Sequence, residues 1–274
     1  MTEASVFVCV QPDGEVRPDT VGTPMPEVEV SISPEGEVLF RSPGVFLGYY
    51  KNPQATAETL ADGWVHSGDA GYIDAHGHLT IIDRARDVSR VANAHHSLFA
   101  PRYLENKLKF SPFIKEAVVH GQERPFVGAL IDIDLEAVGN WAERRGLAYT
   151  SYTDLAARPE VYDLMQGEIT RVNASLADDP HMAGAQIRHF LILHKELDPD
   201  DGKLTRTRKV RRHFVAEKYA DLVEALYGTD DRVTVETQVV FEDGRSGTFK
   251  ADLLIRDVSA ASGPVRQGEG HHPS

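Results

Sequence analysis

The sequence predicts an α+β protein in which a β-rich region is followed by a region that mixes longer helices and strands. Short β-forming runs separated by Gly and Pro fill residues 28–82. After Asp87 the elements become longer, and apolar residues recur at helical spacing between Pro159 and Ala177. The spacing of the early runs is typical of a small, mostly antiparallel sheet or a β-barrel.

The first region contains β-forming runs in the order VEVSIS, EGEVLF, SPGVFLGYY, GWVHSGD and GYIDAHGHLTIID. One helix is expected among them, over residues 52–61. Pro53 lies near its start, and Asp62-Gly63 closes it. We therefore expect a curled sheet interrupted by a short helix.

The second region is expected to begin with a helix from Pro101, followed by the strands IKEAVVHG and PFVGALIDID. A helix ending at Gly146 and a long helix over residues 159–177 come next, and then the strand RHFLILHKEL. Residues 233–240 and 248–255 flank a polar turn and predict a β-hairpin. The Ser/Gly/Pro/His-rich residues 259–274 are expected to be a disordered tail.

Composition excludes several classes of function. The net charge is −13, from 42 acidic and 29 basic residues, so we expect no nucleic-acid partner. Cys9 is the single cysteine, which rules out an intrachain disulfide and favours a cytoplasmic location. We also expect no transmembrane segment, because no apolar run approaches the roughly 20 residues needed to span a bilayer.

Two neighbouring motifs carry most of the functional information. They are GWVHSGD at residues 63–69 and GHLTIIDRARD at residues 77–87. Together they resemble the adenylate-forming superfamily of acyl-CoA synthetases, luciferases and peptide-synthetase adenylation domains. The run ENKLKFSPFIKEAVV at residues 105–119 is most similar to bacterial long-chain fatty acyl-CoA synthetases.

The resemblance implies that Asp69 and Arg84 bind the ribose hydroxyls of the adenylate. A carboxylate can accept hydrogen bonds from two vicinal hydroxyls while a guanidinium donates to them. As isolated residues, Asp69 would cap a turn and Arg84 would pair with Asp83 or Asp87. The flanking motifs favour the binding role. The resemblance also places at Arg86 the hinge about which the small C-terminal domain turns.

The segment LTRTRKVRR at residues 204–212 is similar to the end of long-chain acyl-CoA synthetases. By this resemblance Lys209 is the catalytic lysine of the adenylation half-reaction. Its cation would neutralise charge that develops at the α-phosphate and the carboxylate. Composition alone would favour a solvated basic run, but the spacing from Thr205 to Lys209 favours the catalytic role.

The chain opens on Met-Thr-Glu, which resembles the end of the family's Tyr-Gly-Met-Thr-Glu motif. By this resemblance Thr2 contacts phosphate and Glu3 holds Mg²⁺. The family's phosphate loop, adenine pocket and acyl tunnel would precede this point, and the sequence contains no such phosphate loop. The loop VANAHHSLFAP at residues 91–101 also lacks the glycine that the family offers to the pantetheine arm of CoA.

The resemblance implies a fatty acid–CoA ligase that uses ATP, forms an acyl-AMP intermediate and transfers the acyl group to CoA. We expect residues 1–84 to be the β-rich remnant of a truncated adenylation domain, 85–228 the α+β lid domain and 229–258 an appended hairpin. The chain alone is expected to be inactive. Two alternatives remain open: a non-catalytic partner of a separately encoded N-terminal half, marked by an exposed apolar face over residues 1–45, or a remnant without function.

Overall fold

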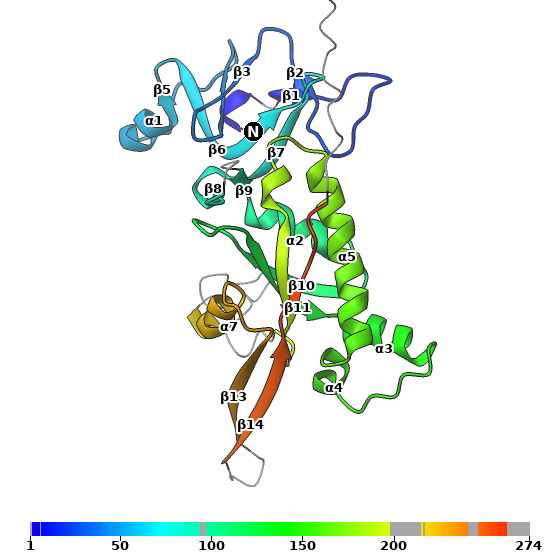
Figure 1. The fold of residues 1–274 in the computed structure, drawn as a ribbon. Coiled ribbons are helices and arrows are strands. Elements are labelled where there is room, and N and C mark those ends of the chain that lie inside the picture. Colours follow the sequence, from blue (N-terminus) through cyan, green and yellow to red (C-terminus); the bar gives the residue numbers. More distant parts are fainter. Residues whose placement is uncertain are drawn as a thin grey trace, which may run out of the picture. The chain divides into compact units, whose positions relative to one another are not determined.

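The structure is a computed structural model that describes residues 2–5, 7–93, 97–197, 215, 217–240 and 246–261 of the chain. It divides into two compact units, Met1–Ser89 and Arg90–Ser274 (Figure 1). Within the described residues, no helix combines the length and apolar character that crossing a membrane requires.

The first unit is built around a curled antiparallel sheet in the order β3-β4-β6-β5, with β7 paired to β6. Its core contains Ala4, Phe40 and Val65, which are almost completely buried. The elements of this unit are η1 (Thr2–Ala4), β1 (Cys9–Val10), β2 (Thr23–Pro24), β3 (Glu29–Ile32), β4 (Glu37–Arg41), α1 (Pro53–Thr59), β5 (Leu60–Ala61), β6 (Trp64–Ile73), β7 (Leu79–Arg84) and η2 (Ala85–Asp87). Strand β8 (Ser89–Arg90) spans the boundary between the units in the sequence.

Strand β6 joins two runs that the sequence presented as separate. GWVHSGD and the start of GYIDAHGHLTIID form one strand, which bulges between Ala70 and Gly71 where it pairs with β7. A Cβ on Gly71 would lie 2.4 Å from the carbonyl oxygen of Thr80, so glycine is required for this close pairing. The rest of GYIDAHGHLTIID turns back and forms β7, and this hairpin within the second run places Asp69 opposite Arg84.

The expected strand over SPGVFLGYY is wrong, because residues 42–50 form turns and irregular backbone. Their backbone groups are used by other partners: Phe46 donates its N–H to the carbonyl of Glu3, and Tyr49 donates to the Thr56 hydroxyl. Gly48 has φ +146°, and a Cβ there would meet the Thr56 side chain at 2.8 Å. These local contacts take the place of a strand ladder.

The second unit contains a four-stranded sheet in the order β10-β11-β12-β15, in which β11 and β12 are parallel. Its elements are β9 (Leu98–Phe99), α2 (Pro101–Lys109), β10 (Ile114–His120), β11 (Val127–Ile133), α3 (Leu135–Glu143), α4 (Tyr152–Ala156), α5 (Pro159–Ala177), η3 (Ala183–Ala185), β12 (Ile187–Ile192), α7 (Ala220–Ala225), β13 (Arg232–Val240), β14 (Ser246–Leu254) and β15 (Arg256–Asp257). The α+β class is confirmed, with a curled β-rich unit and a mixed unit.

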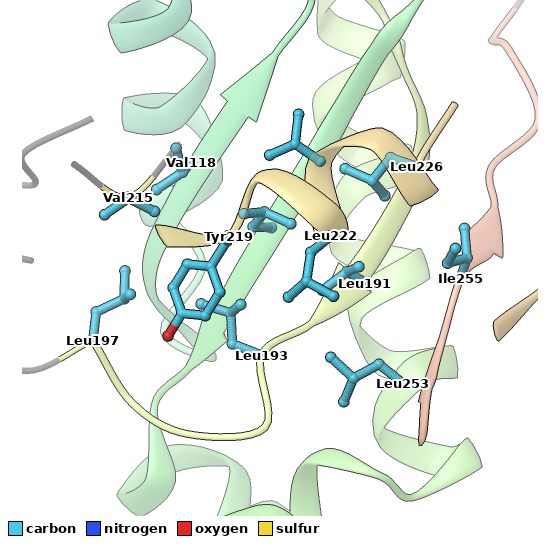
Figure 2. Close-up of a cluster of buried hydrophobic side chains, with 12 residues drawn as sticks. Val118, Leu191, Leu193, Leu197, Val215, Tyr219, Leu222, Leu226, Leu253 and Ile255 are labelled. Atoms are coloured by element: carbon cyan, nitrogen blue, oxygen red, sulfur yellow. The ribbon is translucent and has the colours of Figure 1, made fainter. Parts of the chain in front are cut away.

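Helices cover both faces of the sheet in the second unit. Val118, Leu130 and Leu191 lie side by side across three strands and pack with α7 in one core cluster (Figure 2). Phe190, which precedes Leu191 in β12, points to the opposite face because side chains alternate along a strand. There it stacks on Tyr162 of α5, with ring centroids 5.7 Å apart. Every residue of β11 is therefore buried, as expected for a strand covered on both faces.

Helices α2 and α5 match their expected bounds because their starts are encoded locally. Both have Pro in the first turn, where its missing N–H is not needed. Helix α2 then buries Leu104 and Leu108, and its Glu105 carboxylate accepts a hydrogen bond from the backbone N–H of Val119 on β10. The local signals thus set the helix, and a buried polar contact fixes it on the sheet.

The expected hairpin is present as β13 and β14, which pair antiparallel from Arg232↔Leu254 to Val240↔Ser246. Figure 1 shows it extending from the second unit. Its base is integrated into that unit, because Leu253 and Ile255 belong to the same core cluster as α7, and β15 pairs with β12. The domain limits at residues 84/85 and 228/229 stay predictions, as does disorder in the tail, where residues 262–274 lie outside the described part of the chain.

One buried carboxyl in the second unit is expected to make stability depend on pH. Burial raises the pKa of Asp132 to about 6, while hydrogen bonds from the Leu197 N–H and the Tyr152 hydroxyl act in the opposite direction. Between its ordinary value of 3.8 and about 6, the folded state binds a proton that the unfolded state releases. The contribution of Asp132 therefore falls as pH rises through this window, by about 3 kcal/mol in total.

Urea unfolding at pH 4.5 to 7.5 checks this expectation in a Trp64→Phe background, in which Trp141 of the second unit reports alone. The free energy of unfolding of Asp132→Asn, relative to that of the parent, should rise steadily with pH. This difference should level off above pH 6.5. A stability difference between the two proteins that stays constant across this range would show that Asp132 titrates normally.

Candidate functional site

The structure brings together the two residues that the resemblance assigns to ribose binding. Asp69 on β6 and Arg84 on β7 are cross-strand neighbours, and Arg84 Nη1 lies 2.8 Å from Asp69 Oδ1. The Asp69 side chain is 26% exposed and that of Arg84 is 56% exposed, so solvent reaches both. An exposed ion pair of this kind contributes about 1 kcal/mol or less to stability. A carboxylate beside a guanidinium at an accessible sheet position is suited to bind vicinal hydroxyls.

A second carboxylate, which sequence reasoning missed, holds the backbone of β6 just before Asp69. Glu37 on β4 accepts a hydrogen bond from the backbone N–H of Gly68 at 2.9 Å, and its other oxygen lies 2.9 Å from His66 Nδ1. Gly68 has φ +70°, a conformation that favours glycine. In the sequence, Glu37 is one polar position in an alternating strand, and only the pairing of β4 with β6 reveals its role.

The expected hinge residue, Arg86, lies in the short 3-10 helix η2 that follows Arg84. Its side chain is 84% exposed, and its Nε lies 3.8 Å from Asp87 Oδ1. An exposed side chain in a short connecting element is compatible with a hinge. The rotation itself stays a prediction.

Thr2 and Glu3, the expected phosphate and Mg²⁺ ligands, lie in η1 at the edge of the first unit's core. The Glu3 carboxylate accepts a hydrogen bond from the Tyr49 hydroxyl at 2.8 Å. Hydrogen bonds from its own backbone N–H and from Tyr49 hold the pKa of Glu3 below its ordinary range, so it is ionised at neutral pH. Within the described part of the chain, no cluster of three or more acidic, His or Cys side chains forms a metal cage.

The glycine-free loop at residues 91–101 is described at its two ends, whereas residues 94–96, which include His95 and His96, lie outside the described part. Asn93 donates to the carbonyl of Gly184 at 2.9 Å, and the Ser97 hydroxyl accepts from the Gly184 N–H at 3.1 Å. A Cβ on Gly184 would lie 2.3 Å from Ser97 Oγ. The close contact between Ser97, at the end of the loop, and residue 184 therefore requires a glycine at position 184, which lies outside the loop.

Comparison with known protein families identifies the family to which the chain belongs. Residues 90–231 match the family model described as the AMP-binding enzyme C-terminal domain. The chain belongs to this AMP-binding enzyme family. A long-chain-fatty-acid–CoA ligase of Mycobacterium bovis, FadD15, is 37% identical over 231 residues. Human long-chain-fatty-acid–CoA ligase 1 is 31% identical over 242 residues. The resemblance to the C-terminal portion of adenylate-forming acyl-CoA ligases is confirmed.

Solved structures agree with this family. The adenylation domain of a carboxylate reductase from Mycobacterium chelonae aligns with a TM-score of 0.50 and 25% identity, over 75% of this chain and 31% of that one. The matches cover 84% and 83% of this chain but only 37% of the M. bovis ligase and 34% of the human ligase. The chain thus spans about a third of the length of these AMP-binding relatives.

The catalytic residue expected for an AMP-binding enzyme, Lys209, lies outside the described residues, in segment 198–214. The structure describes the residues that flank this segment, Leu197 and Val215. Both are buried in the core cluster to which Tyr219 and residues of α7 also belong (Figure 2). The described residues on either side of the segment that carries Lys209 therefore belong to one core.

Proposed function

We propose that this chain is the C-terminal part of a fatty acid–CoA ligase that uses ATP to form an acyl-AMP intermediate and transfers the acyl group to CoA. The observation that carries the proposal is the direct opposition of Asp69 and Arg84 at 2.8 Å in a chain that belongs to the AMP-binding enzymes. Fatty acid–CoA ligase relatives support the choice of substrates.

In this proposal Asp69 accepts hydrogen bonds from the ribose hydroxyls and Arg84 donates to them. Lys209 supplies a cation to the α-phosphate and the carboxylate during adenylation, where charge develops. Arg86 is the hinge about which the second unit turns before thioester formation. A neighbour of this fold, the A domain of carboxylic acid reductase from Segniliparus rugosus, was solved in complex with AMP, which is consistent with an adenylate ligand.

Glu3 fits the role of an Mg²⁺ ligand in this reaction. Mg²⁺ is commonly held by one or two carboxylates together with substrate phosphates, rather than by a cage made of protein alone. Glu3 offers one ionised carboxylate that is oriented by Tyr49, and Thr2 precedes it with a hydroxyl for phosphate. Bound Mg²⁺ would neutralise phosphate charge as pyrophosphate leaves.

A chimeric ligase tests the proposal. In the M. bovis relative, the region that matches this chain would be replaced by residues of this chain, and ATP- and palmitate-dependent pyrophosphate release would be measured. We expect the chimera to release pyrophosphate and the 274-residue chain alone to release none. Asp69→Ala should reduce release in the chimera by about 10- to 100-fold, because hydrogen bonds to a charged group are worth about 1.5–3 kcal/mol.

The control is a second cross-strand ion pair in the same sheet. Glu29 and Arg41 are register partners on β3 and β4 and form an exposed ion pair. Glu29→Ala removes the same kind of contact without touching the proposed site, so it should leave pyrophosphate release within about twofold. If Asp69→Ala and Glu29→Ala lost pyrophosphate release equally, the Asp69–Arg84 pair would have only a structural role.

A second candidate function, a docking module for a separately encoded N-terminal half, is favoured by exposed apolar side chains on the first unit. Phe7 is 63% exposed and Val16 is 70% exposed within residues 1–45, and Leu47 and Tyr50 are more exposed still. Side chains of this kind are costly on a surface that stays in water. The same surface would equally suit packing against a preceding part of one longer chain.

An experiment that mixes two separately expressed chains distinguishes this candidate function from the first. The 274-residue chain would be combined with a separately expressed N-terminal part of the M. bovis ligase, and binding and pyrophosphate release would be followed. Restored release that is lost in Lys209→Ala would establish the docking function. Absence of binding at micromolar concentrations would exclude it.

A further inference from the structure

We propose that Asp132 is a positioning residue that holds Leu197, the last described residue before the segment that carries Lys209. The catalytic role of that lysine rests on the proposed function, whereas the anchoring contact stands on the structure itself. Asp132 is completely buried in β11, one of the two inner strands of the sheet in the second unit, and it is not among the residues assigned to adenylate binding. A buried carboxylate is costly unless it is fully hydrogen-bonded.

Each carboxylate oxygen of Asp132 has a different partner. Oδ2 accepts a hydrogen bond from the backbone N–H of Leu197 at 3.0 Å, and Oδ1 accepts one from the Tyr152 hydroxyl at 2.9 Å. Tyr152 begins α4, and its hydroxyl oxygen in turn accepts from the Ile133 N–H. The carboxylate thus joins β11 to a helix and to Leu197, the last described residue before segment 198–214.

Three further contacts hold the residues just before this segment. Leu193 donates its N–H to the carbonyl of Ile131 at 2.9 Å, which extends the β11–β12 pairing beyond β12. The Thr153 hydroxyl of α4 donates to the carbonyl of His194 at 2.8 Å. Lys115 Nζ on β10 lies 3.2 Å from Glu196 Oε2. Strand β12 therefore leads into a stretch, residues 193–197, that three elements hold in place.

The chemistry of the contact explains why a carboxylate is needed. Both partners of Asp132 present donors, so a group with two acceptor oxygens satisfies them and an amide satisfies only one without rearrangement. The charged groups around Asp132 are Lys115 and Glu196, which pair with each other. Glu116, its cross-strand register partner, pairs with Lys109. Because the charged side chains near Asp132 pair with each other or with Lys109, the carboxylate of Asp132 remains available to accept from the Leu197 N–H.

Residue-resolved amide hydrogen exchange of the full 274-residue chain tests the proposal. In Asp132→Leu, which removes both acceptors, exchange of the Leu197 amide should accelerate on the order of 10- to 100-fold, as expected for a buried donor that loses its partner. Amides of Ile187–Ile192 in β12 should change less than about threefold. Asp132→Asn keeps one acceptor and should give a smaller acceleration at Leu197.

The matched control is Asp134→Asn, two residues further along. Asp134 also accepts from a backbone N–H, that of Ala137 at 2.8 Å, but this bond caps α3 and does not involve Leu197. It should leave the Leu197 amide unchanged. If Asp132→Leu does not fold, Tyr152→Phe removes one of the two partners of the carboxylate, and a smaller but selective acceleration at Leu197 is expected.

Two results would overturn the proposal. One is an unchanged Leu197 amide in the folded Asp132 variants. The other is an equal acceleration of β12 and Leu197, which would mean that Asp132 stabilises the whole unit and positions nothing. The exchange measurement does not depend on catalysis, so a failure of Lys209 as the adenylation residue would appear only in the activity of the chimera.

Discussion

Lys209→Ala is expected to reduce pyrophosphate release by the chimeric ligase by about 100- to 1,000-fold. The physical reason is that a cation close to developing charge at the α-phosphate is lost, an interaction worth roughly 4 kcal/mol at ~4 Å and an effective dielectric of about 20. The KM for palmitate should change little, because the lysine acts on the transition state and not on the acyl chain. Steady-state pyrophosphate release checks both quantities.

Lys203→Ala is the control for this experiment, since Lys203 lies in the same segment but outside the motif LTRTRK. It should retain release within about twofold, because the proposal gives this lysine no part in adenylation. Thioester formation from supplied acyl-AMP should survive in Lys209→Ala. A comparable loss in both half-reactions would assign Lys209 a structural role.

The largest expected effect on stability comes from Phe190→Ala. Phe190 is completely buried in β12 and stacks on Tyr162, which is 2% exposed. Removing the ring leaves a cavity and ends the stacking contact, so the free energy of unfolding of the second unit should fall by about 3–5 kcal/mol. Urea unfolding monitored by Trp141 fluorescence in the Trp64→Phe background measures the change.

Phe110→Ala supplies the matched control, because Phe110 is 86% exposed at the end of α2. Removal of this ring should change the free energy of unfolding by about 0.5 kcal/mol or less. If both variants lost the same stability, the packing described for Phe190 would not be the one that the protein uses.

Elements with strong local signals could be predicted from the sequence. Helix α5 follows from Pro159 in its first turn and from apolar residues at helical spacing, and the structure gives the predicted bounds. Residues 42–50 could not be assigned correctly, because their β-forming composition is overridden by contacts with Glu3 and Thr56, which are distant in the sequence. Helix α1 ends two residues early for a similar reason: Leu60 and Ala61 pair with β6 around the turn at Asp62-Gly63.

The residues of the candidate site also differ in whether the sequence could predict them. Asp69 and Arg84 were identifiable because family motifs flank them, and a hairpin of fixed register explains why they meet. Glu37 and Asp132 carry no local signal. Each is an acidic residue in a strand pattern, and its partners come from other parts of the chain. Gly68 of β6 is the partner of Glu37, and Tyr152 and Leu197 are the partners of Asp132.

The sequence by itself determined the α+β class, the family and the paired ribose-binding candidates, because periodicity, turn residues and motif spacing are local properties. Only the tertiary structure decided that Asp69 and Arg84 form a direct pair. It also decided that residues on either side of the Lys209 segment share one core, and that Asp132 is buried where it holds Leu197. Burial and hydrogen bonding between distant residues depend on how elements pack, and that packing is not written in any single stretch of sequence.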